Sequence, residues 1–196
     1  MTKKWVYISR TAKEKLADTL GHEPQVAELK EIFGGKGAGL AEMTGLGLPV
    51  PPSFTITTEA CVEYLDRDDF PAGMWEQTLE ALKDIEEQTG KQFGDPKNPL
   101  LVSVRSGARQ SMPGMMDTVL NLGLNDETRA SLAELTDNEW FSYDAYRRFI
   151  SMFSDIVMDY SREHFEEKLE ELKQEEGVES DAEVSLEGMK KLVDVY

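Results

Sequence analysis

The sequence predicts an α+β fold, with a mixed α/β lobe over residues 1–110 and a hairpin loop followed by a helical subdomain over 111–196. Short runs that alternate apolar and polar residues lie in the first half and are typical of strands. From Glu127 onward, apolar residues instead recur at steps of three and four, which is typical of helices. A stretch that contains glycine, proline and arginine separates the two patterns and predicts the seam.

The first lobe is expected to open with a strand and a glycine-rich turn. The run KWVYIS (4–9) alternates and contains aromatic and β-branched residues, which favour strands. Residues 10–30 are polar and show no clear period, so no element is predicted there. The glycines of FGGKGAGL (33–40) predict a flexible turn that leads into a short helix, and the prolines of LPVPP (48–52) end that helix.

Another strand, two helices and a buried strand are expected next. The run SFTITT (53–58) predicts the strand, and a helix begins near Thr58. Residues 72–89 place apolar residues at helical spacing, and Gly90 ends this helix. The apolar run NPLLVSVRSG (98–107) predicts a buried strand. The tryptophans are expected in the core: Trp5, Trp75 and Trp140.

The second lobe is expected to be almost wholly helical. NEWFSYDAYRRFISMFSDIVMDY (138–160) predicts a long helix, REHFEEKLEELKQEEG (162–177) an amphipathic one, and 185–196 a short last helix. One stripe of the long helix should be buried, because its large apolar residues recur at steps of three and four. These residues are Tyr143, Tyr146, Phe149, Ile150, Phe153 and Val157.

The charge of the chain restricts its partners. The 38 acidic residues outnumber the 21 basic ones and give a formal net charge of −17. Such a charge repels nucleic acid and anionic lipid, so we expect neither as a partner. An anionic small ligand would need local cations, together with a divalent metal.

The chain offers few signals for targeting or metal binding. The single cysteine, Cys61, allows no intrachain disulfide and suits a reducing compartment. No run approaches the roughly 18 apolar residues of a membrane span, and the first residues lack a signal-peptide pattern. We therefore expect a cytoplasmic protein. His22 and His164 have no metal-ligand spacing around them, so no metal site is predicted.

The motif GGKGAGL is a candidate phosphate-binding turn. Gly34, Gly35 and Gly37 would let backbone N–H groups approach an anion, a helix N-terminus follows, and Lys36 stands between the glycines. The spacing is not that of a Walker A motif. The alternative is a tight connection between elements, with Lys36 in solvent.

Arg105 ends the apolar strand and is a second candidate. A half-buried guanidinium needs an anionic partner that accepts two hydrogen bonds, and a phosphate would serve. A structural aspartate or glutamate would serve equally, and the same alternative applies more strongly to Arg109.

The run SMPGMMDT (111–118) is expected to form the tip of a hairpin, with Pro113 and Gly114 in the turn. One interpretation is a glycine loop that closes over phosphates and lacks order without an anion. The alternative is that the methionines pack beneath the turn. The candidate residues of this loop are Ser111, Gly114, Met115, Met116, Asp117 and Thr118.

Four segments in order resemble one family. They are KWVY, GGKGAGLAEMTGLGLPVPPSFTITTEAC, FGDPKNPLLVSVRSGARQSMPGMMDTVLNLGLND and YDAYRRFISMFSDIVM. Together they are similar to the N-terminal nucleotide-binding domain of the pyruvate phosphate dikinase family, over nearly the whole chain. The related phosphoenolpyruvate synthases share the Gly-Gly-Lys-Gly turn and the Ser-Val-Arg-Ser strand but, as a rule, lack the Ser-Met-Pro-Gly-Met-Met-Asp-Thr loop.

The resemblance implies an ATP-grasp-like fold with ATP and Mg²⁺ between lobes. A phosphoryl group would pass to a histidine on a separate swivelling domain, inorganic phosphate would be a second acceptor, and pyruvate would become phosphoenolpyruvate at a distant barrel domain. The expected partners are therefore ATP, phosphate, and the phosphohistidine and pyruvate-binding domains of the full-length enzyme. By the same resemblance, Lys36 would contact phosphate, Arg105 would lie beside the γ-phosphate, and residues 114–118 would cover the polyphosphate.

Two features depart from the family pattern. Residue 53 is serine where the family usually has glycine. The chain also stops at Tyr196, and the family's acidic Mg²⁺ ligands and phosphorylated histidine are expected beyond that point, outside this chain. We therefore expect a truncated chain that is incomplete for catalysis alone. The alternatives are a non-catalytic module that binds a nucleotide or a partner, or a piece of an enzyme like phosphoenolpyruvate synthase.

Overall fold

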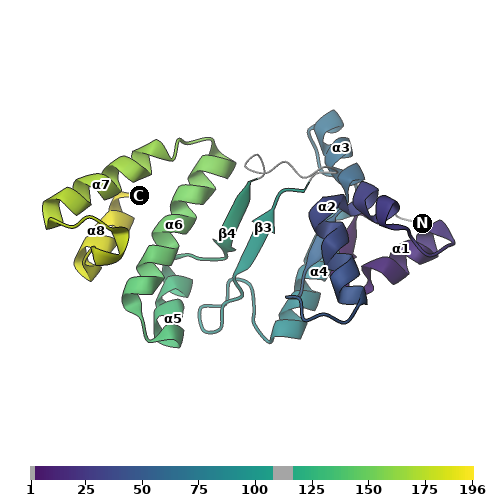
Figure 1. Ribbon diagram of the computed structural model, residues 1–196, viewed down its shortest axis with the longest axis horizontal. Coiled ribbons are helices and arrows are strands. Elements are labelled where there is room, and N and C mark those ends of the chain that lie inside the picture. The colour runs from purple at the N-terminus through teal and green to yellow at the C-terminus, as the bar shows by residue number, and fades with distance from the viewer. Residues whose placement is uncertain (1–2, 108–116) are drawn as a thin grey trace. The chain divides into compact units, whose positions relative to one another are not determined.

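The computed structural model describes residues 3–107 and 117–196. Its contacts divide these residues into two compact units (Figure 1). Unit 1 contains residues 3–90 and 106–107, and unit 2 contains 91–105 and 117–196. The predicted boundary between residues 110 and 111 lies outside the described residues. Each unit combines helices with a small sheet, so the expected mixture of α and β structure is confirmed.

Unit 1 is built on a two-stranded antiparallel sheet. Strand β1 (Val6–Ile8) pairs with β2 (Phe54–Ile56), and Tyr7 lies opposite Thr55. Both strands were predicted, and both are shorter than the alternating runs that indicated them. Around them lie the 3₁₀ turn η1 (Ser9–Thr11) and the helices α1 (Ala12–Leu20), α2 (Val26–Gly45), α3 (Thr58–Arg67) and α4 (Met74–Thr89).

Residues 10–30, for which no element was predicted, contain α1 and the start of α2. Helix α1 buries only Ala12 and Leu16, which is too few apolar residues to give a visible period. Helix α2 begins with a capping box between Gln25 and Glu28, in which each side chain accepts from the other residue's backbone N–H. Local polar contacts therefore define this helix start.

The prediction of a flexible turn at the glycine run is wrong, because these glycines lie within α2. Only Gly34 leaves the helical conformation, with φ 68° and ψ 174°, and it kinks the helix. Gly37 instead serves packing. A Cβ atom on Gly37 would lie 2.8 Å from Thr55 Cγ2, so the helix backbone meets β2 closely at this point. Small residues here let the helix approach the sheet.

The core of unit 1 has two parts. One joins β1 to α1 and α2 through Tyr7, Leu16, Leu29 and Phe33, and the other joins β1 to α3 and α4. In the second, buried Trp5 donates from its indole N–H to the Ala72 carbonyl at 3.1 Å. The other two tryptophans differ from the expectation: Trp140 is half-buried and Trp75 is exposed.

Unit 2 carries the predicted hairpin strands. Strand β3 (Val102–Arg105) pairs antiparallel with β4 (Thr118–Leu122). The expectation that β3 is buried is wrong, since its residues are half-buried or exposed. The predicted helical second half is confirmed, and it consists of α5 (Asp126–Thr136), α6 (Glu139–Met158), α7 (Glu163–Glu176), η2 (Asp181–Glu183) and α8 (Leu186–Val195).

Helix α6 buries a different face from the predicted one. Its aromatic and aliphatic stripe is half-buried, and Val157 is exposed. The reason is that α6 contacts β4 and α5 as well as α8, so neighbours enclose its polar side too. The residues that it buries are Ser142, Asp144, Ala145, Arg147 and Ser151.

A separate core in unit 2 links α7 to α8 through Leu169, Leu172, Met189 and Leu192.

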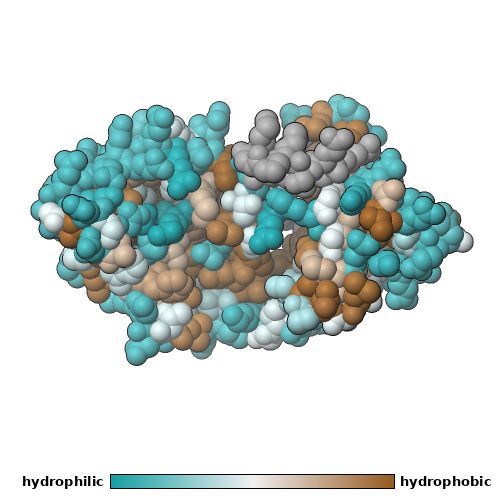
Figure 2. Space-filling model, in the orientation of Figure 1, coloured by the Kyte–Doolittle hydropathy of each residue, from teal (hydrophilic) through white to brown (hydrophobic). Residues whose placement is uncertain are grey.

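The visible face of both units is mainly hydrophilic, with separate apolar areas (Figure 2). Among the described residues, no helix has both the length and the apolar character that crossing a membrane requires.

Candidate functional site

Lys36 lies just beyond the kink in α2. Helical geometry resumes after Gly34, so Lys36 is in the first turn of the second helical segment. The backbone N–H groups in the first turn of a helix generally lack helical acceptors. Its side chain is exposed, and its Nζ donates to the carbonyl of Ser106 at 3.1 Å, within unit 1. This contact ties the glycine motif to the residue directly after β3, a partner that the sequence did not indicate.

Arg105 is the last residue of β3 in unit 2. Its side chain is exposed, and its Nε donates to Ser103 Oγ at 3.3 Å. The interpretation of Arg105 as a half-buried group is therefore wrong. Because the guanidinium is exposed, burial does not distinguish a phosphate from a structural carboxylate as its partner, and both alternatives for Arg105 stay open.

The strand register brings Arg105 opposite Thr118, the first residue of β4. These two candidate residues therefore lie side by side in unit 2. Asp117 precedes Thr118 and is exposed. The remaining candidates in and before this loop lie outside the described residues, namely Arg109, Ser111, Gly114, Met115 and Met116. The expectation that the loop lacks order without an anion concerns the same residues and stays a prediction. Lys36 and Arg105 belong to different units, so the expectation that both contact one polyphosphate stays a prediction.

The two histidines have local structural contacts. His22 Nε2 lies 3.0 Å from Glu28 Oε1, beside the capping box of α2. The hydrogen bond from the Gln25 backbone, and then the one with His22, lower the pKa of Glu28. His164 packs its ring against Tyr160. Over residues 3–107 and 117–196, no group of three or more histidine, cysteine or acidic side chains is arranged to hold a metal.

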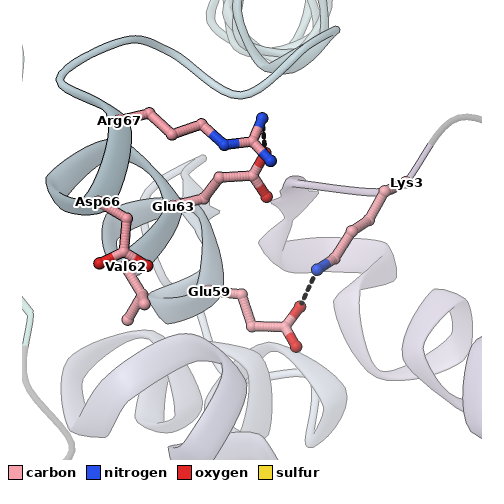
Figure 3. A pocket seen from close by; sticks show the side chains of 6 residues that line it. All are labelled: Lys3, Glu59, Val62, Glu63, Asp66 and Arg67. Atoms are coloured by element: carbon pink, nitrogen blue, oxygen red, sulfur yellow. Dashed lines mark ion pairs between the residues drawn. The ribbon is translucent and has the colours of Figure 1, made fainter.

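A pocket of about 400 Å³ lies on α3, and none of the candidate residues lines it (Figure 3). Two ion pairs line it, Lys3 Nζ to Glu59 Oε2 at 3.1 Å and, along α3, Arg67 Nη1 to Glu63 Oε1 at 3.0 Å. Asp66 adds a further carboxylate. Since each cation already faces a carboxylate and an acidic group remains, this pocket disfavours phosphate.

The comparisons with known proteins agree with the motif order. A family model described as pyruvate phosphate dikinase, AMP/ATP-binding domain, matches residues 30–77 and 69–168. The chain is 53% identical over 169 residues to pyruvate, phosphate dikinase 1, chloroplastic, of Zea mays. It is 50% identical over 171 residues to pyruvate, phosphate dikinase of Clostridium symbiosum, and 51% identical over 168 residues to that of Entamoeba histolytica.

These similarities cover most of this chain and a small part of each relative. The three alignments include 86%, 87% and 85% of the chain, but 18%, 20% and 19% of the relatives. The chain therefore spans about a fifth of the length of these relatives.

Proposed function

This chain belongs to the family of pyruvate phosphate dikinase AMP/ATP-binding domains, and we propose that it supplies the phosphate-contacting part of an ATP site. The observation that carries the proposal is the position of Lys36. It follows the Gly34 kink, at the start of a helical segment, and its ammonium group is exposed. A helix N-terminus and a lysine together attract a phosphate group.

Arg105 is the proposed second cation. Ser106, whose carbonyl accepts from Lys36, directly follows Arg105 in the chain, which supports a common role for the two cations. A guanidinium can donate two parallel hydrogen bonds to phosphate oxygens, while a lysine acts as a point charge. The residues of the 111–118 loop are proposed as further contacts, with glycine allowing close approach to the polyphosphate.

The chemical role of these cations would be electrostatic. During phosphoryl transfer, negative charge spreads over the equatorial oxygens of the transferred group, and fixed cations stabilise it. Mg²⁺ would neutralise further charge when bound. We propose that its ligands lie outside this chain, as do the histidine that accepts the phosphoryl group and the domain that binds pyruvate. The proposed overall reaction converts ATP, phosphate and pyruvate to AMP, diphosphate and phosphoenolpyruvate.

Calorimetric titration of Mg·ATP and of tripolyphosphate into the chain tests the site. We expect Lys36→Ala and Arg105→Ala each to weaken binding by about 1.5–3 kcal/mol, the scale of a hydrogen bond to a charged group. Lys30→Ala is the matched control, because Lys30 is an exposed lysine on the same helix, before the kink. Arg105→Lys keeps the charge and should recover only part of the affinity.

The result can contradict the proposal in two ways. If Lys36→Ala and Lys30→Ala weaken binding equally, the two lysines act through the general charge of the chain rather than at a site beside the kink. If neither Lys36→Ala nor Arg105→Ala weakens binding, the phosphates bind at another place on the chain. Circular dichroism of each variant distinguishes lost binding from lost folding.

A further inference from the structure

Three aromatic rings form an exposed stack in unit 1. Tyr64 and Phe70 have ring centroids 5.4 Å apart at 28°, and Phe70 and Trp75 have centroids 6.0 Å apart at 16°. The exposed fractions of Tyr64, Phe70 and Trp75 are 39%, 55% and 53%. Large apolar side chains normally gain about 1.5–3 kcal/mol from burial, so three adjacent exposed rings need an explanation.

The stack rests on a well-supported backbone. Tyr64 is in α3, Trp75 is in the first turn of α4, and Phe70 lies in the connection between these helices. The indole N–H of Trp5 holds Ala72 in this connection, and Met74 is buried beside it. The rings are therefore presented by anchored elements.

One further apolar residue extends the surface along α4. Leu79 lies four residues after Trp75, on the same face of the helix, and is also exposed. We call Tyr64, Phe70, Trp75 and Leu79 the aromatic platform. None of these residues contributes to the proposed phosphate site, so the two proposals stand on separate observations.

Acidic residues surround the aromatic platform. Asp68 and Asp69 precede Phe70, and the Asp69 carboxylate also accepts from the Phe70 backbone N–H at 2.8 Å. Glu76 and Glu80 follow Trp75 and Leu79 on α4, and all four carboxylates are on exposed residues. The nearby Arg67 is paired with Glu63 at 3.0 Å, and Lys83 lies one turn beyond Leu79. Among these described residues, the four carboxylates outnumber the one remaining cation, Lys83, so the immediate surroundings of the platform are negative.

This charge decides which occupant fits. If a second copy of the chain bound through the same platform, its four carboxylates would face the four carboxylates of the first copy. Like charges at an interface are unfavourable. Nucleic acid and anionic lipid are repelled for the same reason. Arginine and lysine are attracted by the carboxylates, and by the outer faces of the rings through cation–π interactions, which are strongest with tryptophan.

We propose that the aromatic platform binds a protein segment in which arginine or lysine alternates with apolar residues. The apolar side chains would cover Phe70, Trp75 and Leu79, and the cations would pair with Asp69 and Glu76. Aromatic residues dominate the binding energy of such interfaces, whereas charges at the rim mainly set association rate and specificity.

Fluorescence anisotropy with labelled peptides tests the proposal on the whole chain. The probe is a peptide in which arginine and leucine recur at helical spacing. Two control peptides replace its arginines by glutamate or its leucines by glycine. We expect the arginine–leucine peptide to bind, and both controls to bind at least about tenfold more weakly, a change of about 1.4 kcal/mol.

Variants then locate the binding surface. Trp75→Ala and Leu79→Ala leave the charge unchanged and should each raise the dissociation constant at least about fivefold, whereas Leu135→Ala, an exposed leucine on α5, should not change it. Leu79 lies outside the ring stack, so its variant keeps the test valid if Trp75→Ala misfolds. Glu76→Gln should weaken binding mainly at low salt.

Three outcomes would overturn the proposal. They are equal binding of the leucine-free peptide, unchanged binding by both platform variants, and no binding to the wild-type chain. Sedimentation provides a further check by measuring the oligomeric state. If the wild-type chain is a dimer and Trp75→Ala is a monomer, the platform binds a second copy of the chain instead. All these outcomes are independent of Mg·ATP binding, so they do not test the phosphate site.

Discussion

Arg147 of α6 holds Asp181, the first residue of η2, through a contact of 2.9 Å between Nη2 and Oδ2. The side chain of Arg147 is only 7% exposed, and the same nitrogen lies 2.7 Å from Asp144 Oδ1. The Asp144 contact has the distance of an ion pair but lacks the geometry of a hydrogen bond, since Asp144 Oδ1 has no hydrogen-bond partner among the described residues. The Nε atom of Arg147 also has no such partner there. A buried cation thus connects the central helix of unit 2 to the segment before α8.

Removal of this buried cation should destabilise unit 2. Arg147→Ala would leave a void beside Asp144, whose remaining partner is the exposed Arg148, so the loss should not exceed the roughly 3–5 kcal/mol that is typical of a broken buried ion pair. Arg148→Ala is the control, because Arg148 pairs with the same aspartate at 3.0 Å but is itself exposed, and such pairs contribute about 0–1 kcal/mol. Chemical denaturation measures both, and equal losses for the two variants would contradict the assigned role of Arg147.

Glu176 should make stability depend on pH. Its carboxylate accepts from the hydroxyl and the backbone N–H of Ser185, at 2.6 Å and 2.7 Å, and these hydrogen bonds lower its pKa below the ordinary value of 4.5. Since the folded pKa is the lower one, the stabilisation is present above about pH 4.5 and is lost as the pH falls through the folded pKa. Melting curves from pH 7 to pH 3 should show a smaller acid-induced decrease in Glu176→Gln than in the wild type.

Asp181 should act in the same direction. Burial alone would raise its pKa, but the hydrogen bond and charge of Arg147, with Lys173, outweigh burial and lower it. Asp181→Asn should therefore also reduce the acid-induced loss of stability. If both this variant and Glu176→Gln kept the wild-type pH dependence, other carboxylates would be responsible.

Two glycines of α2 should respond oppositely to alanine. A Cβ atom on Gly37 would lie 2.8 Å from Thr55 Cγ2 and 2.9 Å from Phe33 Cβ, so Gly37→Ala should overpack this contact and cost about 1–3 kcal/mol. Gly39 has no atom within 4 Å of the corresponding position, and Gly39→Ala should be neutral or stabilising by up to about 1 kcal/mol. Thermal unfolding of the pair checks the close contact between α2 and β2, and a neutral Gly37→Ala would show that this contact is looser.

The isolated chain should not form phosphoenolpyruvate from ATP, phosphate and pyruvate. The proposed phosphohistidine and pyruvate-binding domains lie outside it, and it spans about a fifth of the length of the relatives it matches. A coupled assay for phosphoenolpyruvate measures this directly. If the pure chain shows turnover and Lys36→Ala abolishes it, the chain contains more of the catalytic machinery than we propose.

Local sequence signals determined most helices of this protein, and the order of its motifs determined its family. The helix that begins at Thr58 is capped by the Thr57 side chain, and Gly90 ends α4 in a left-handed conformation. Such caps act within one turn of the chain, so they can be identified from neighbouring residues. The order of the motifs predicted the family, which the matched family model confirms.

Only the tertiary structure decided how the glycine motif and α6 are used. Glycine usually breaks helices, yet Gly37 lies within α2, where β2 approaches so closely that a Cβ atom would clash. Helix α6 buries Arg147 in place of Val157 because partners from distant parts of the chain, among them Asp181, lie on its polar side. The burial of a side chain depends on what packs over it, and residues far away in the sequence supply those neighbours. Periodicity therefore predicted that α6 is a helix, while its neighbours decided which face is buried.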